Sequence, residues 1–83
     1  MIHELKIRPE YFIDVQSGKK NFEICKYDRN FRVGDYLALN EFHEDQYTGR
    51  CVIRKITYVL CDQEFCKEGY VVLGLSESEI KDC

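Results

Sequence analysis

The chain has 83 residues, of which 45% are hydrophobic and 33% are charged. A chain of this length builds one core, which excludes a second folded domain, and six Tyr and five Phe exclude a disordered chain. No apolar run reaches the roughly 18 to 20 residues of a membrane-spanning helix, and the first residues lack the pattern of a signal peptide. We therefore expect a single cytoplasmic domain over residues 1–83.

The net charge of −3 is unevenly distributed along the chain. Residues 1–32 carry seven Lys and Arg against five Asp and Glu, whereas residues 33–83 carry five bases against ten acids. The negative total argues against a domain that holds nucleic acid over its whole surface. The basic excess, which is concentrated in residues 17–32, predicts that any anion site lies there, although a solvated basic surface is the simpler alternative.

An apolar run over residues 2–7, which ends before Pro9, predicts a strand followed by a helix. Proline suits the first turn of a helix, and Gly18 supplies the left-handed conformation that ends the last turn. The apolar residues at helical spacing between them are Tyr11, Phe12 and Val15. We expect the helix to stop at Gly18.

The next segment, residues 20–25, alternates in the manner of a half-buried strand. We expect Phe22 and Ile24 to face the core. Glu23 and Cys25 then lie on the opposite face, which is available to a ligand.

The second half of the chain reads as three further strands. A strand over residues 36–42 is joined by a polar hairpin loop, residues 43–49, to a Val-, Ile- and Thr-rich strand over 51–60, and we expect these two strands to pair antiparallel. Residues 70–75 form the fifth strand, and residues 76–83 a helical turn or a frayed tail. The fold class is α+β and mainly β: a small curved or closed β-barrel of five strands with an N-terminal helix.

The five cysteines are an odd number with no C-x-x-C pair. Together with the absence of a signal peptide, this pattern predicts free thiols and no disulfide framework. Structural zinc sites use two close pairs of ligands, whereas Cys61 and Cys66 are one loose pair. We therefore expect no metal and no cofactor.

The order of these elements, with RPEYF at 8–12, GKKNFEICK at 18–26, FRVGD at 31–35 and EGYVVL at 68–73, resembles the ASCH domains of the PUA-like superfamily. The resemblance covers residues 3 to 75. It is closest to small bacterial and phage members that are grouped as a domain of unknown function, some of them described as activating-signal-cointegrator homologues. Of the signature G-x-K-x-x-E-x-R, Gly18, Lys20 and Glu23 are present; Cys25 replaces the arginine, and Lys26 follows it.

The resemblance implies a barrel of five to six strands that binds RNA in a cleft between the first helix and the barrel. The residues it places at this site are Gly18, Lys19, Lys20, Glu23, Cys25 and Lys26. Physical reasons support this use: glycine lets backbone N–H groups approach a ligand, lysines attract phosphate, and a carboxylate accepts hydrogen bonds from an amino group of a base. Cysteine in place of arginine removes a guanidinium that could bind phosphate through two hydrogen bonds. Lys26 does not replace it, because the next residue of a regular strand points to the other face.

Two other functions remain open. Some ASCH relatives hydrolyse the amide of acylated cytidines with a lysine that Lys20 matches, but Glu23 stands where they have a hydroxyl residue. A protein-interaction domain that uses the acidic second half is the other alternative. These residues also have an interpretation without any ligand, in which Gly18 only ends a helix and Lys20 and Glu23 form a surface ion pair. We favour a non-catalytic module that binds RNA or a nucleotide.

Overall fold

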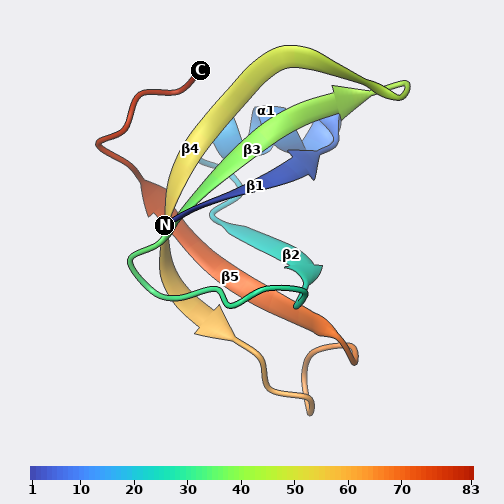
Figure 1. The fold of residues 1–83 in the computed structure, drawn as a ribbon, viewed down its shortest axis with the longest axis vertical. Coiled ribbons are helices and arrows are strands. Elements are labelled where there is room, and N and C mark those ends of the chain that lie inside the picture. The colour runs from blue at the N-terminus through green and yellow to red at the C-terminus, as the bar shows by residue number, and fades with distance from the viewer.

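Five strands and one helix succeed each other in the computed structural model, which describes residues 1–83 (Figure 1). They are β1 (Ile2–Ile7), α1 (Pro9–Gln16), β2 (Phe22–Lys26), β3 (Tyr36–His43), β4 (Gln46–Leu60) and β5 (Tyr70–Glu77). The predicted mainly-β class with an N-terminal helix is confirmed. α1 has eight residues, and no helix is long and apolar enough to cross a membrane.

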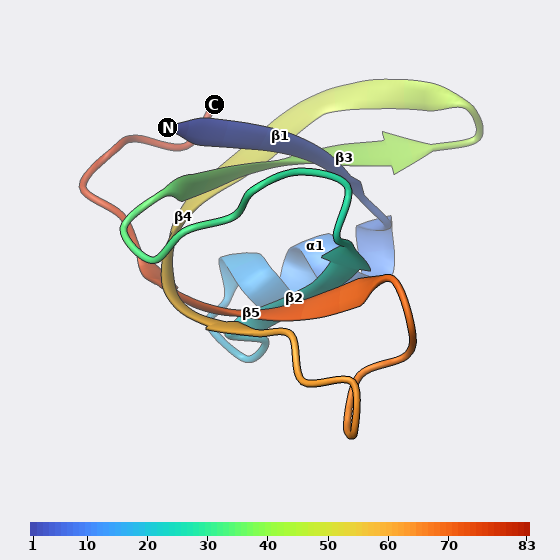
Figure 2. The same cartoon turned by 60° about the horizontal axis from the view of Figure 1, so that its bottom comes forward.

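The five strands form one sheet in the order β1-β3-β4-β5-β2. β1 runs parallel to β3, and the other three pairs are antiparallel, including the predicted pair of β3 with β4. The long β4 pairs with β3 along its first part and with β5 along its second, so the sheet curls into a half-barrel (Figure 2). β1 and β2 are the two edges. We call the gap between their unpaired edges the seam.

The core fills the concave side of the half-barrel. Its eleven buried residues are Ile7, Phe12, Val15, Phe31, Leu37, Leu39, Val52, Ile56, Val71, Leu73 and Leu75. α1 contributes Phe12 and Val15, which are three positions apart and face the sheet together. Tyr11 was expected on this face and is instead exposed, because successive helical residues are about 100° apart.

The two faces of β2 are the reverse of the prediction. Phe22 and Ile24 are exposed, whereas Glu23 and Cys25 point inward, and Cys25 packs against the core. The pairing with β5 decides this, because Cys25 lies opposite the buried Val71. Strand alternation alone separates two faces without saying which one is buried.

The hairpin between β3 and β4 is tighter than the predicted loop over residues 43–49. β4 begins at Gln46, so the turn is Glu44 and Asp45, both with positive φ. Two successive left-handed residues match the twist of paired strands, and Asp tolerates this conformation better than most residues.

The C-terminal tail, residues 78–83, is folded back over the outer face of β3 and β4. Ile80 packs against a small cluster of Ala38, Cys51 and Ile53. The carboxylate of Asp82 accepts a hydrogen bond of 2.8 Å from the backbone N–H of Ile53. The expectation of a frayed tail or a helical turn is therefore wrong.

A disulfide between Cys51 and Cys83 fixes this tail, with 5.1 Å between the two Cα atoms. The prediction of five free thiols without a disulfide is wrong for this pair. The half-cystines are 32 positions apart in the sequence, and the return of the tail along the sheet brings them together. Cys25, Cys61 and Cys66 are free.

Candidate functional site

A cleft opens between the start of α1 and the edges of β1 and β2. Its volume is about 550 Å³, and it is lined by Lys6, Arg8, Tyr11, Lys20, Phe22, Glu23 and Ile24. Local structure places its lysine: Gly18 takes a φ of +86° at the end of α1, and the backbone N–H of Lys20 then donates to the carbonyl of Asp14 at 2.9 Å. The chain is thereby turned toward β2.

Lys20 and Glu23 meet inside this cleft as an ion pair. Their side chains are only 14% and 12% exposed. The Lys20 ammonium also donates to the carbonyl of Phe22 at 3.1 Å and lies 4.9 Å from the ring centre of Phe22 and 5.4 Å from that of Tyr11. Its charge is therefore already matched by a carboxylate and by two aromatic faces.

The other predicted site residues are scattered. Gly18 and Lys19 are exposed and do not line the cleft. Burial, and then the neighbouring carboxylate of Glu23, raise the pKa of the Cys25 thiol to about 11, so it remains protonated at neutral pH. Lys26 lines the adjoining hollow instead.

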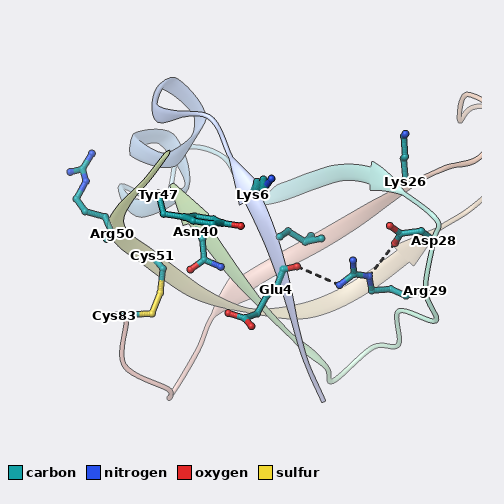
Figure 3. Close-up of a pocket in the computed structure, with 12 residues that line it drawn as sticks. Glu4, Lys6, Lys26, Asp28, Arg29, Asn40, Tyr47, Arg50, Cys51 and Cys83 are labelled. Atoms are coloured by element: carbon teal, nitrogen blue, oxygen red, sulfur yellow. Dashed lines mark hydrogen bonds and ion pairs between the residues drawn. A yellow bond between two sulfur atoms is a disulfide. The ribbon is translucent and has the colours of Figure 1, made fainter. Parts of the chain in front are cut away.

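Two further hollows continue the cleft along the seam. The first of these, which we call the larger hollow, has a volume of about 1090 Å³ and shares Lys6 with the cleft. The other, which we call the third hollow, has a volume of about 850 Å³ and shares Asp28 and Arg29 with the larger hollow. Figure 3 shows Arg29 reaching across the larger hollow, where it donates to Asp28 at 3.0 Å and to the carbonyl of Glu4 at 3.4 Å.

The three hollows carry more bases than acids. The bases are Lys6, Arg8, Lys20, Lys26, Arg29, Arg32 and Arg50, and the acids are Glu4, Glu23, Asp28 and Asp35. Three of these seven bases are held in ion pairs by Glu23, Asp28 and Glu41. The four bases without an ion pair are Lys6, Arg8, Lys26 and Arg32. The seam is thus positive in a chain whose net charge is negative.

A buried carboxylate anchors the hairpin end of the larger hollow. Glu41 accepts hydrogen bonds of 2.9 and 2.7 Å from the guanidinium of Arg50 and one of 2.6 Å from the hydroxyl of Thr48. Arg50, followed by Thr48, holds the pKa of Glu41 below its usual range. The guanidinium lies 4.8 Å from the ring centre of Phe12, which joins the hairpin to α1.

A histidine–carboxylate pair borders the third hollow. The Nε2 atom of His3 lies 2.9 Å from the Oδ2 atom of Asp35, and its ring stands edge-on to that of Phe31. The hydrogen bond to His3 holds the pKa of Asp35 below its usual range. Because His3 is buried, the pair braces β1 against the loop before β3. No group of three or more His, Cys, Asp or Glu side chains is arranged to hold a metal ion.

Sequence reasoning found Lys20 and Glu23 but missed how β1 and α1 complete the cleft. Lys6 and Arg8 entered the prediction only within the basic excess of residues 1–32, and Tyr11 only as an apolar residue at helical spacing. The sequence does contain a signal for them: Lys6 and Arg8 are two residues apart, so in an extended strand they point to the same side, just before the helix.

These features define a small, mainly-β domain with a basic cleft at the open edge of a half-barrel. Residues 2–75 match the family described as a domain of unknown function, DUF3850, and the chain belongs to this family. It is also similar to a protein of Escherichia phage P2 described as an uncharacterized 12.9 kDa protein in the GpA 3′ region. The two are 44% identical over 79 residues, which cover 95% of this chain and 72% of the relative.

Proposed function

We propose that this domain is an ASCH-like module of the PUA-like superfamily that binds RNA or a nucleotide in the cleft and along the seam. The observation that carries the proposal is the row of four cations without carboxylate partners, Lys6, Arg8, Lys26 and Arg32, beside one open edge of the sheet. Unpaired Lys and Arg side chains supply the sequence-independent part of nucleic-acid affinity, because they replace counterions on phosphates.

The aromatic rings of the cleft suit the bases of such a ligand. Tyr11 and Phe22 are each 44% exposed, and both rings lie close to the ammonium of Lys20. Exposed aromatic side chains stack on unpaired bases with little preference for sequence. A phosphate beside Arg8 and a base against Tyr11 would use both halves of the cleft, which supports a single-stranded ligand.

The contacts of Lys20 favour binding over catalysis. An amidohydrolase of the kind found among ASCH relatives needs a free lysine and a hydroxyl nucleophile. Here Glu23 occupies the ammonium of Lys20, and the one hydroxyl among the lining residues is the phenol of Tyr11. We therefore propose a binding module without hydrolytic activity.

The test is a fluorescence titration of a labelled short single-stranded RNA at several salt concentrations. Arg8→Ala and Lys6→Ala are each expected to weaken binding and to reduce the slope of log affinity against log salt by about 0.7, the contribution of one phosphate contact on a single strand. Lys81→Ala, which removes an exposed base outside the three hollows, is the control. Equal binding by all three variants and the wild type would refute the site, and turnover of an acylated cytidine would favour the enzyme.

A further inference from the structure

The outer face of β4, β5 and β2 carries apolar side chains that no other element covers. Pairing places Tyr58, Gly74 and Phe22 in one row across the three strands, and Leu60, Val72 and Ile24 in the next. Tyr58 is 63% exposed and Ile24 57% exposed. Beside them, the loop of residues 61–69 presents Phe65, which is 77% exposed. We call this surface the outer apolar face.

The loop makes this face concave rather than flat. A hollow of about 410 Å³ lies between the loop and the sheet, and it is lined by Ile24, Phe65, Cys66, Lys67, Tyr70 and Val72. Five of these six residues are hydrophobic. The hollow differs in character from the basic hollows of the seam, with which it shares only Ile24 among the lining residues.

The size of the face fits a weak interface. Aromatic side chains bury roughly 150 to 250 Å² each, so Phe22, Ile24, Tyr58 and Phe65 together expose on the order of 450 Å². This value lies in the middle of the range for the largest patch on a typical monomer, roughly 300 to 600 Å². A standard interface buries about 800 Å² on each partner, which the polar rim of the face would complete.

The charges around the face are complementary to each other. The loop side is acidic: residues 61–69 hold Asp62, Glu64 and Glu68 against the single base Lys67. The β2 side is basic at Lys26, which follows Phe22 and Ile24 on the exposed face of the strand and has no ion pair. When a second copy is related by a two-fold axis, the acidic side of each copy faces the basic side of the other.

We propose that the outer apolar face is the contact between two copies of this chain in a two-fold symmetric dimer. The acidic loop of each copy lies along the basic β2 side of the other, and Phe65 packs against Ile24 and Phe22 of the other copy. Each contact then occurs twice, which doubles the apolar area and both charge attractions. The inference does not rest on RNA binding, but the contact covers Phe22 and Ile24, which also line the cleft.

The test is sedimentation equilibrium of the protein without RNA over a range of concentrations. We expect a reversible dimer. Phe65→Glu is expected to raise the dissociation constant at least tenfold, because it places a carboxylate in an apolar contact twice. Val33→Glu is the matched control, since Val33 is equally apolar and 63% exposed but lies outside the face. Circular dichroism verifies that both variants are folded.

Charge reversal tests the predicted orientation. Glu64→Lys alone is expected to weaken the dimer, and Lys26→Glu in the same chain is expected to restore part of the loss. A wild-type chain that stays monomeric at roughly 1 mM would overturn the proposal. It would also be overturned by a dimer that Cys61→Ser abolishes, since that result indicates a disulfide through the exposed thiol, or by a dimer that Phe65→Glu leaves intact.

Discussion

Replacing Glu23 by Gln is expected to strengthen the binding of single-stranded RNA. The Lys20 ammonium is matched by the Glu23 carboxylate in the cleft, and both side chains are largely buried. The amide of Gln has nearly the same shape but no charge, so it releases the ammonium for a phosphate. The carbonyl of Phe22 and the ring of Tyr11 still hold Lys20 in place.

The magnitude follows from the number of free cations. The seam offers four bases without carboxylate partners, and each phosphate contact on a single strand contributes about 0.7 to the salt slope, so the wild type is expected near −2.8. One additional contact moves the slope to about −3.5. Because affinity scales with salt to the same power, the gain at about 0.1 M salt is roughly fivefold.

The assay is the salt series of fluorescence titrations, with two controls. Glu77→Gln removes an exposed carboxylate outside the three hollows and is expected to leave the slope unchanged. Lys20→Met combined with Glu23→Gln is expected to cancel the gain, since no ammonium is then released. Weaker binding by Glu23→Gln alone would refute the reasoning, because it would mean that the carboxylate itself contacts the ligand.

Three further predictions concern stability and reactivity. Cys83→Ser, which removes the disulfide, is expected to lower the free energy of unfolding by roughly 3.7 kcal/mol, the loop-closure value for the 32-residue separation, in urea titrations without reductant. Arg50 lowers the pKa of Glu41, so the stability that this carboxylate adds is present above its unfolded pKa and is lost as the pH falls through the folded pKa. Arg50→Gln is expected to reduce the fall of the melting temperature with pH over that acidic range. An unchanged dependence of the melting temperature on pH would contradict the assignment. Because burial raises the pKa of Cys25 to about 11, iodoacetamide at mildly alkaline pH is expected to label the exposed Cys61 well before Cys25, as mass spectrometry of timed samples would show.

The elements that depend on neighbouring residues could be predicted from the sequence. Pro9 and Gly18 bound α1, and all five strands contain the runs that indicated them, although β4 begins five residues earlier than predicted, at Gln46. The facing of β2 could not be predicted, because Phe22 and Ile24 are as apolar as core residues. Their exposure follows from the pairing of β2 with β5, which places both side chains on the outer apolar face.

The candidate site divides in the same way. Lys20 and Glu23 stand three residues apart around a turn, so their meeting was accessible to sequence reasoning. Lys6 reaches the same cleft because β1 pairs with β3 and leaves its other edge open toward β2, which is a property of the whole sheet. The disulfide likewise forms because the tail packs across the outer face of β4, and the spacing of the cysteines in the sequence does not predict where the tail packs.

The open seam itself explains why cations gather where they do. A half-barrel leaves two strand edges with unpaired carbonyls, and such edges invite further strands unless charged side chains protect them. Two carbonyls at the seam have cationic donors: Lys20 donates to Phe22 on β2, and Arg29 donates to Glu4 on β1. Long basic side chains therefore cover the open edges whether or not a ligand is bound. A phosphate ligand would use cations that the architecture already needs, so substitutions at the seam have to be compared for self-association as well as for RNA affinity. In such a comparison, loss of RNA binding without new association isolates the binding role of Lys6 and Arg8 from the protection of the edges.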